Sequence, residues 1–124
     1  MSITLGIVVA GLCFLAIFLS GIRLSRSGKP YGTLILTIHK LLSLAALVLL
    51  LIAIYQKKQA VALSAVELIG GVVTGLFFIG CIISGGLLST GKPMPTAILR
   101  LHQMTSPLSM LSTAVTLYLL LGRW

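Results

Sequence analysis

The two histidines of the chain, His39 and His102, give the strongest chemical signal in the sequence. Each lies nine residues after a proline, Pro30 or Pro93, inside an apolar run. If each proline starts a helix, a rise of about 1.5 Å per residue puts both imidazoles at one depth, about 13 Å inside. Ionisable side chains within apolar spans are costly and are candidates for function by default. Neutral imidazole is also a common metal ligand, so the pair predicts a metal site with His39 and His102 as its ligands.

The histidines belong to an internal repeat of the sequence. A shift of 64 residues aligns positions 6–25 with positions 70–89, and 10 of the 20 aligned residues are identical. Beyond the first loop the shift becomes 63, and 8 of the 16 residues at positions 28–43 are identical. The polar and conformational matches are Ser20-Gly21 with Ser84-Gly85, Gly28-Lys29-Pro30 with Gly91-Lys92-Pro93, His39 with His102, and Ser43 with Ser106. The chain therefore consists of two sequence repeats, each carrying one histidine.

Four apolar runs are predicted to be the elements that position these residues. They cover about residues 3–25, 30–55, 62–89 and 96–122, and each reaches the ~20 residues that a helix needs to cross ~30 Å of hydrocarbon. Proline is favoured at the first helical position, so Pro30 and Pro93 are expected to start the second and fourth helices. Short connections make neighbouring helices antiparallel. The predicted fold is all-α: an integral membrane, up-down four-helix bundle forming a single transmembrane domain over residues 1–124.

The repeat and the charges predict how this bundle is arranged in a membrane. The two hairpins, about residues 3–55 and 62–122, run in the same sense, so a pseudo-twofold axis along the membrane normal is expected to relate them. Six cations lie toward the first and third loops, and three lie toward the other side: Arg23, Arg26, Lys29, Lys40, Lys92 and Arg100 against Lys57, Lys58 and Arg123. This excess predicts that loops 1 and 3 are cytoplasmic and that both termini are outside, in a prokaryotic plasma membrane.

The composition excludes most other classes of protein. Hydrophobic residues make up 58% of the chain and charged residues 8%, whereas a soluble domain carries about 25% charge. The net charge of +8 lies at the ends of apolar runs, so the expected partner is the lipid bilayer and no nucleic acid is expected. The sequence has no catalytic triad pattern, carboxylate pair, phosphate loop or dinucleotide fingerprint. Any chemistry is therefore expected to come from a bound cofactor.

Further residues around each histidine suit a porphyrin, whose iron takes imidazole as an axial ligand. Ser43 and Ser106 lie one helical turn beyond His39 and His102, where either hydroxyl could contact the ring N–H or the macrocycle edge. The ring N–H of an axial histidine also commonly bonds a backbone carbonyl, here that of Ile35 or Ile98. The serines could instead serve only helix packing, and both interpretations remain open.

The first and third runs supply residues that could accommodate and pack against a flat ring. Gly11 and Gly75 leave space for it, and Phe14 and Phe78 could pack against it. The pattern Gly71-x-x-x-Gly75 is also typical of close helix packing, so this second role stays open.

Cations near the loops could pair with carboxylates that the protein itself lacks. Lys29, Lys92 and Arg100 lie at the height where haem propionates would point, and such charge-assisted contacts are strong. The only acidic residue, Glu67, lies near the start of the third run, on the opposite side. Its carboxylate is expected to interact favourably with the N-terminus of that helix and to contact Lys57 or Lys58. A proton-carrying role is the alternative.

With one histidine at matching depth on each of two helices, the chain resembles the transmembrane b-type cytochromes. These include the cytochrome b561 superfamily and the haem-anchoring subunits of quinone-linked dehydrogenases. The resemblance is carried by His39 and His102, and it implies one bis-histidine haem b per chain. It also implies electron transfer with a redox partner protein or quinone, by the chain alone, as a homodimer, or as an oxidoreductase subunit of a larger membrane complex. Another metal, purely structural histidines, a small transporter using Glu67, or a cofactor-free structural subunit of a membrane complex are the alternatives.

Overall fold

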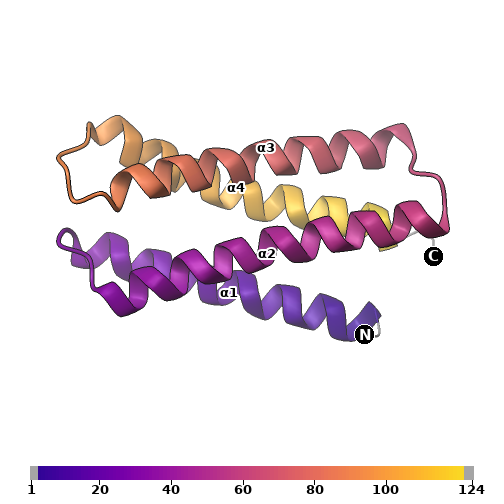
Figure 1. Cartoon of the computed structure of the whole chain (residues 1–124), viewed down its shortest axis with the longest axis horizontal. Coiled ribbons are helices and arrows are strands. Elements are labelled where there is room, and N and C mark those ends of the chain that lie inside the picture. The colour runs from indigo at the N-terminus through magenta and orange to yellow at the C-terminus, as the bar shows by residue number, and fades with distance from the viewer. Residues whose placement is uncertain (1–2, 122–124) are drawn as a thin grey trace. The chain divides into compact units, whose positions relative to one another are not determined.

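The computed structural model describes residues 3–121, and this part of the chain is helical with short connections (Figure 1). The elements are α1 (Ile3–Ser27), α2 (Thr33–Ala60), α3 (Ala65–Leu88) and α4 (Thr96–Leu121). Each contains a stretch long and apolar enough to cross a membrane. The predicted all-α class with four membrane-length helices is therefore confirmed. Gly122, where the fourth predicted run ended, and Arg123 lie outside the described residues.

Helices α2 and α4 begin later than the prolines predicted. Each starts at a threonine, three residues after its proline, at Thr33 and Thr96. Both connections turn at the glycine of the Gly-Lys-Pro motif, since Gly28 has φ 65° and Gly91 has φ 75°. Glycine adopts this left-handed conformation without a Cβ penalty, which is why it commonly follows a helix end. The motif therefore forms the turn itself, and the proline lies in the connection rather than at the first helical position.

The second helix ends later than its apolar run. α2 continues to Ala60, five residues beyond the predicted end at Tyr55. Lys57 therefore lies in the helix and not in a loop, and its side chain is 1% exposed. A buried ammonium group requires partners, and these are described with the polar sites below.

The start of α3 is set by a capping box. The hydroxyl of Ser64 accepts a hydrogen bond from the backbone N–H of Glu67, at 3.3 Å. The carboxylate of Glu67 in turn accepts one from the backbone N–H of Ser64, at 2.7 Å. This reciprocal pair satisfies two donors that the first helical turn leaves without partners. The predicted contact of Glu67 with a helix N-terminus is thus confirmed.

The described chain forms two compact units, one up to Leu49 and one from Leu50 onward. The first contains α1 and the first part of α2. The second contains the last part of α2 together with α3 and α4, which lie side by side (Figure 1). The boundary falls inside α2 and not in the connection between the two sequence repeats. The pseudo-twofold relation between the repeats stays a prediction.

The interface between α3 and α4 contains buried hydroxyl groups, while many of the large apolar side chains of these helices are exposed. Thr74 is fully buried and its hydroxyl lies 2.5 Å from that of Ser112 and 3.0 Å from that of Thr116. Leu76 and Leu111 are more than half exposed. Hydroxyl groups bonded between helices, with aliphatic side chains outside, are typical of helices packed in lipid. The second unit therefore has the polarity expected of a membrane protein.

Candidate functional site

His39 is held by α1 within the first unit. It is the seventh residue of α2, about 9 Å from the start of the helix by the helical rise. Its ring Nδ1 lies 2.9 Å from the hydroxyl of Ser20 and 3.1 Å from the backbone oxygen of Ile17. A carbonyl oxygen only accepts hydrogen bonds, so Nδ1 carries a proton and donates it.

His102 has the same arrangement within the second unit. It is the seventh residue of α4, and its Nδ1 lies 2.9 Å from the hydroxyl of Ser84 on α3. The hydroxyl proton of Ser84 is directed to the backbone oxygen of Gly80, at 2.7 Å. The Ser84 oxygen therefore accepts from Nδ1–H of His102, as the Ser20 oxygen accepts from His39 while its own proton goes to Ile17.

This pattern assigns the tautomer of both rings. A neutral imidazole that donates through Nδ1 carries its lone pair on Nε2. Metal-binding histidines commonly use one ring nitrogen as ligand and donate the other N–H to a fixed acceptor, which orients the ring. His39 and His102 thus both have the protonation that ligation through Nε2 requires.

Each ring also packs against a glycine on the same neighbouring helix. A Cβ built at Gly21 would lie 3.2 Å from Cε1 of His39, and one at Gly85 would lie 3.0 Å from Cε1 of His102. These approaches leave no room for a larger residue without a shift of the ring or the backbone. The sequence therefore needs glycine there for packing of the histidine, and not only for close contact of the helices.

The Ser-Gly pairs were not among the predicted site residues. The signal that could have found them is the repeat, in which Ser20-Gly21 and Ser84-Gly85 are identical. Ser20 and Ser84 lie 19 and 18 residues before the histidines along the chain, so spacing within a single helix does not identify them. The rotation of α1 and α3 brings them against the imidazoles.

The hydroxyls of Ser43 and Ser106 do not make the predicted contact with the imidazole N–H groups in the bonds that the structure shows. Their hydroxyls donate to the backbone oxygens of His39 and His102, at 2.7 Å and 2.6 Å. Within a helix, a serine hydroxyl commonly donates its hydrogen bond to the backbone carbonyl four residues earlier. The Nδ1 partners that the structure shows come from the neighbouring helices. The carbonyls of Ile35 and Ile98 are likewise not the partners shown. Contact of either serine with a macrocycle edge stays a prediction.

The predicted ring-packing residues have related environments in the two units. A Cβ at Gly11 or at Gly75 would meet no atom within 4 Å, so both positions border open space. Phe14 is half-buried and Phe78 is 4% exposed. Each phenylalanine lies seven residues, or about two turns, before the glycine that contacts the histidine, and therefore on the same helix face.

The predicted propionate partners are all exposed. Lys29 and Lys92 lie in the two Gly-Lys-Pro connections, and Arg100 lies in the second turn of α4, two residues before His102. The ammonium nitrogen of Lys29 is 6.0 Å from the ring centroid of Tyr31. Their pairing with cofactor carboxylates stays a prediction.

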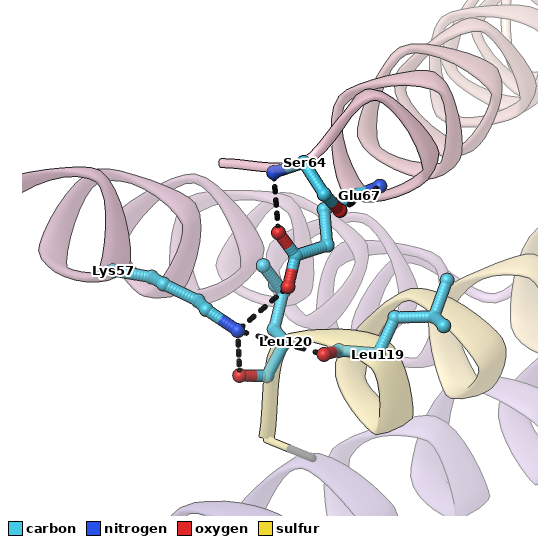
Figure 2. Close-up of polar contacts among 5 residues, drawn as sticks. All are labelled: Lys57, Ser64, Glu67, Leu119 and Leu120. Atoms are coloured by element: carbon cyan, nitrogen blue, oxygen red, sulfur yellow. Dashed lines mark hydrogen bonds and ion pairs between the residues drawn. The ribbon is translucent and has the colours of Figure 1, made fainter. Parts of the chain in front are cut away.

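A second polar site joins three helix ends in the second unit (Figure 2). The Lys57 ammonium lies 2.7 Å from a carboxylate oxygen of Glu67, and both side chains are almost completely buried. It also donates to the backbone oxygens of Leu120 and Leu119 at the end of α4. A cation is favourable at a helix C-terminus and an anion at an N-terminus. The predicted contact between Glu67 and Lys57 is therefore confirmed.

Comparison with known proteins does not assign the chain to a family. No protein-family model matches the sequence, and neither a curated protein nor a solved structure matches it significantly. The resemblance to transmembrane b-type cytochromes therefore stays a prediction, which the sequence bases on His39 and His102.

Proposed function

We propose that the protein is a membrane b-type cytochrome in which His39 and His102 are the two axial ligands of one haem b. The observation that carries the proposal is the repeated His–Ser–Gly arrangement. In each unit an Nδ1–H bond of 2.9 Å to a serine leaves the lone pair on Nε2, as ligation requires. A packing role alone does not require both halves of the chain to keep the same histidine, serine and glycine.

The haem supplies one-electron transfer, and the protein residues set its position. Ser20 and Ser84 fix the tautomer and the rotation of the rings, and Gly21 and Gly85 allow the rings to lie against the helix backbones. If His39 and His102 both hold the iron, the site would favour electron relay over binding of a reactant. A quinone or a redox protein would then exchange electrons at the macrocycle edge. Thr33, Thr96 and Arg100 are candidates to bond such a quinone.

The distribution of exposed cations supports the proposed orientation. The six cations toward the α1–α2 and α3–α4 connections are all exposed. Near the end of α2, Lys57 is buried against Glu67, whereas Lys58 is exposed. Among the described residues, the exposed cations therefore lie mostly toward the two connections. We therefore propose that the two connections face the cytoplasm and that the termini lie outside.

The contacts of Glu67 favour a structural role over its use in a transporter. Both carboxylate oxygens are engaged, one by Lys57 and one by the Ser64 backbone. A proton or substrate carrier in the membrane needs a carboxylate that can change partners during its cycle.

A visible spectrum of the purified protein, before and after dithionite, tests the proposal directly. The expected result is one haem per chain with the split α and β bands of low-spin haem b after reduction. Carbon monoxide should bind slowly or not at all, since both axial positions are occupied. A featureless spectrum after expression with added haem would contradict the proposal. Rapid stoichiometric binding of carbon monoxide would contradict the six-coordinate site.

The Ser84→Ala variant should retain haem about tenfold less well than the native protein, since partners that orient a ligand histidine typically contribute 10–100-fold in affinity. Haem transfer to apomyoglobin measures this retention. Ser84→Thr keeps the hydroxyl and is the matched control, while Ser20→Ala tests the equivalent contact in the first unit. Equal retention in Ser84→Ala and Ser84→Thr would show that the hydroxyl does not orient a ligand.

The Arg100→Gln variant should lower the midpoint potential by tens of millivolts, where about 59 mV corresponds to a tenfold change for one electron. A cation near the propionates favours the reduced haem, so its loss favours the oxidised one. Spectroelectrochemical titration gives the potential, and Lys58→Gln, at the other end, is the control. An unchanged or higher potential in Arg100→Gln would indicate that Arg100 only extends to the lipid headgroups.

A further inference from the structure

Two arginines lie on one face of the last two turns of α1. Arg23 and Arg26 are three residues apart in the helix that ends at Ser27, and both side chains are exposed. Residues at this spacing have Cβ atoms ~5–6 Å apart. Two guanidinium groups placed so closely can contact one common anion.

The chain has no acidic side chain to offer these arginines. Glu67 is the one acidic residue in the sequence, and its two carboxylate oxygens are bonded to Lys57 and to the Ser64 backbone. An anion that pairs with Arg23 and Arg26 through a carboxylate or phosphate group must therefore come from outside the side chains of this protein.

The internal repeat shows that the helical hairpin does not require arginine at these two positions. The alignment that matches Ser20 with Ser84 places Leu87 and Thr90 at the positions of Arg23 and Arg26. The second unit nevertheless turns at Gly91 and holds its histidine through Ser84. The turn and the histidine contacts therefore form without the arginines, which indicates a role that the second hairpin does not share.

We infer that Arg23 and Arg26 bind the phosphate headgroup of an anionic phospholipid. The guanidinium fork matches phosphate oxygens in geometry and charge. The pair lies at the end of a membrane-length helix, where headgroups are found. Lys29 adds a third cation nearby, and its ammonium nitrogen lies 6.0 Å from the ring centroid of Tyr31. Tyrosine is enriched at membrane interfaces. This inference does not depend on haem.

Electron paramagnetic resonance of spin-labelled lipids tests the inference with the full chain in phosphatidylcholine vesicles. The native protein should immobilise labelled phosphatidylglycerol more strongly than labelled phosphatidylcholine, by about fivefold for each arginine, since one cation near a headgroup contributes ~1 kcal/mol. The double variant Arg23→Leu with Arg26→Thr carries the residues that the second hairpin already has at these positions. It should lose most of the preference, while Lys58→Gln, at the other end, should keep it.

Three results would overturn the inference. The first is a double variant that keeps the preference, and the second is an equal loss in Lys58→Gln, which would indicate net charge alone. The third is displacement of the lipid by inorganic phosphate at constant ionic strength, which would indicate a site for soluble phosphate. If the double variant fails to fold by circular dichroism, the reciprocal change Leu87→Arg with Thr90→Arg decides. It should raise the preference, and no increase would contradict the role of an arginine pair.

Discussion

The His102→Ala variant, and separately the His39→Ala variant, should lose the low-spin haem spectrum. Each change removes one of the two proposed axial bonds, so the haem should be lost or become high-spin and five-coordinate. The absorption spectrum of the reduced protein measures both outcomes, and the haem-to-chain ratio separates them. Leu101→Ala, an exposed neighbour of His102, is the matched control and should keep the native spectrum.

Added imidazole distinguishes lost ligation from misfolding. In the His102→Gly variant the ring is replaced by a cavity, and free imidazole can supply the missing ligand to a folded protein. The low-spin bands should return as imidazole is added, and the same should hold for His39→Gly. Unchanged low-spin spectra in both alanine variants would rule out ligation by this pair.

The Lys57→Met variant should lower the thermal unfolding midpoint in detergent by on the order of 10 °C. Removing one partner of a buried ion pair leaves the other charge without compensation. Lys57 bonds Glu67 and the end of α4, so its loss also removes a cation from a helix C-terminus. The midpoint can be followed by circular dichroism at 222 nm.

A double-variant cycle shows whether the loss comes from the pair. Lys57→Met with Glu67→Gln leaves no unpaired charge, so the double variant should be more stable than Lys57→Met alone. Lys58→Met, at the exposed neighbouring position, should change the midpoint little. If the two changes lower the midpoint additively, Lys57 and Glu67 do not stabilise the protein as a pair.

The number and the type of the helices could be predicted because the membrane leaves few alternatives. In hydrocarbon every backbone polar group must be bonded within the chain, so four apolar runs of sufficient length become four helices. The helix bounds were less well predicted. α2 begins at Thr33, after the turn at Gly28, and continues to Ala60. An apolar pattern marks what lipid can cover, whereas the buried partners of Lys57 allow the helix to extend beyond it.

The sequence by itself determined the repeat, the equal registers of His39 and His102, and the use of Glu67 at the start of α3. These follow from residue spacing along one helix, which the fixed helical rise converts into position. Only the tertiary structure decided which groups bond the imidazoles. Ser43 and Ser106, one turn away on the same helices, bond backbone oxygens, while Ser20 and Ser84 on the neighbouring helices accept from Nδ1. The reason is that a contact between helices depends on their relative rotation, which is set by side-chain packing and does not appear in the spacing of either helix alone.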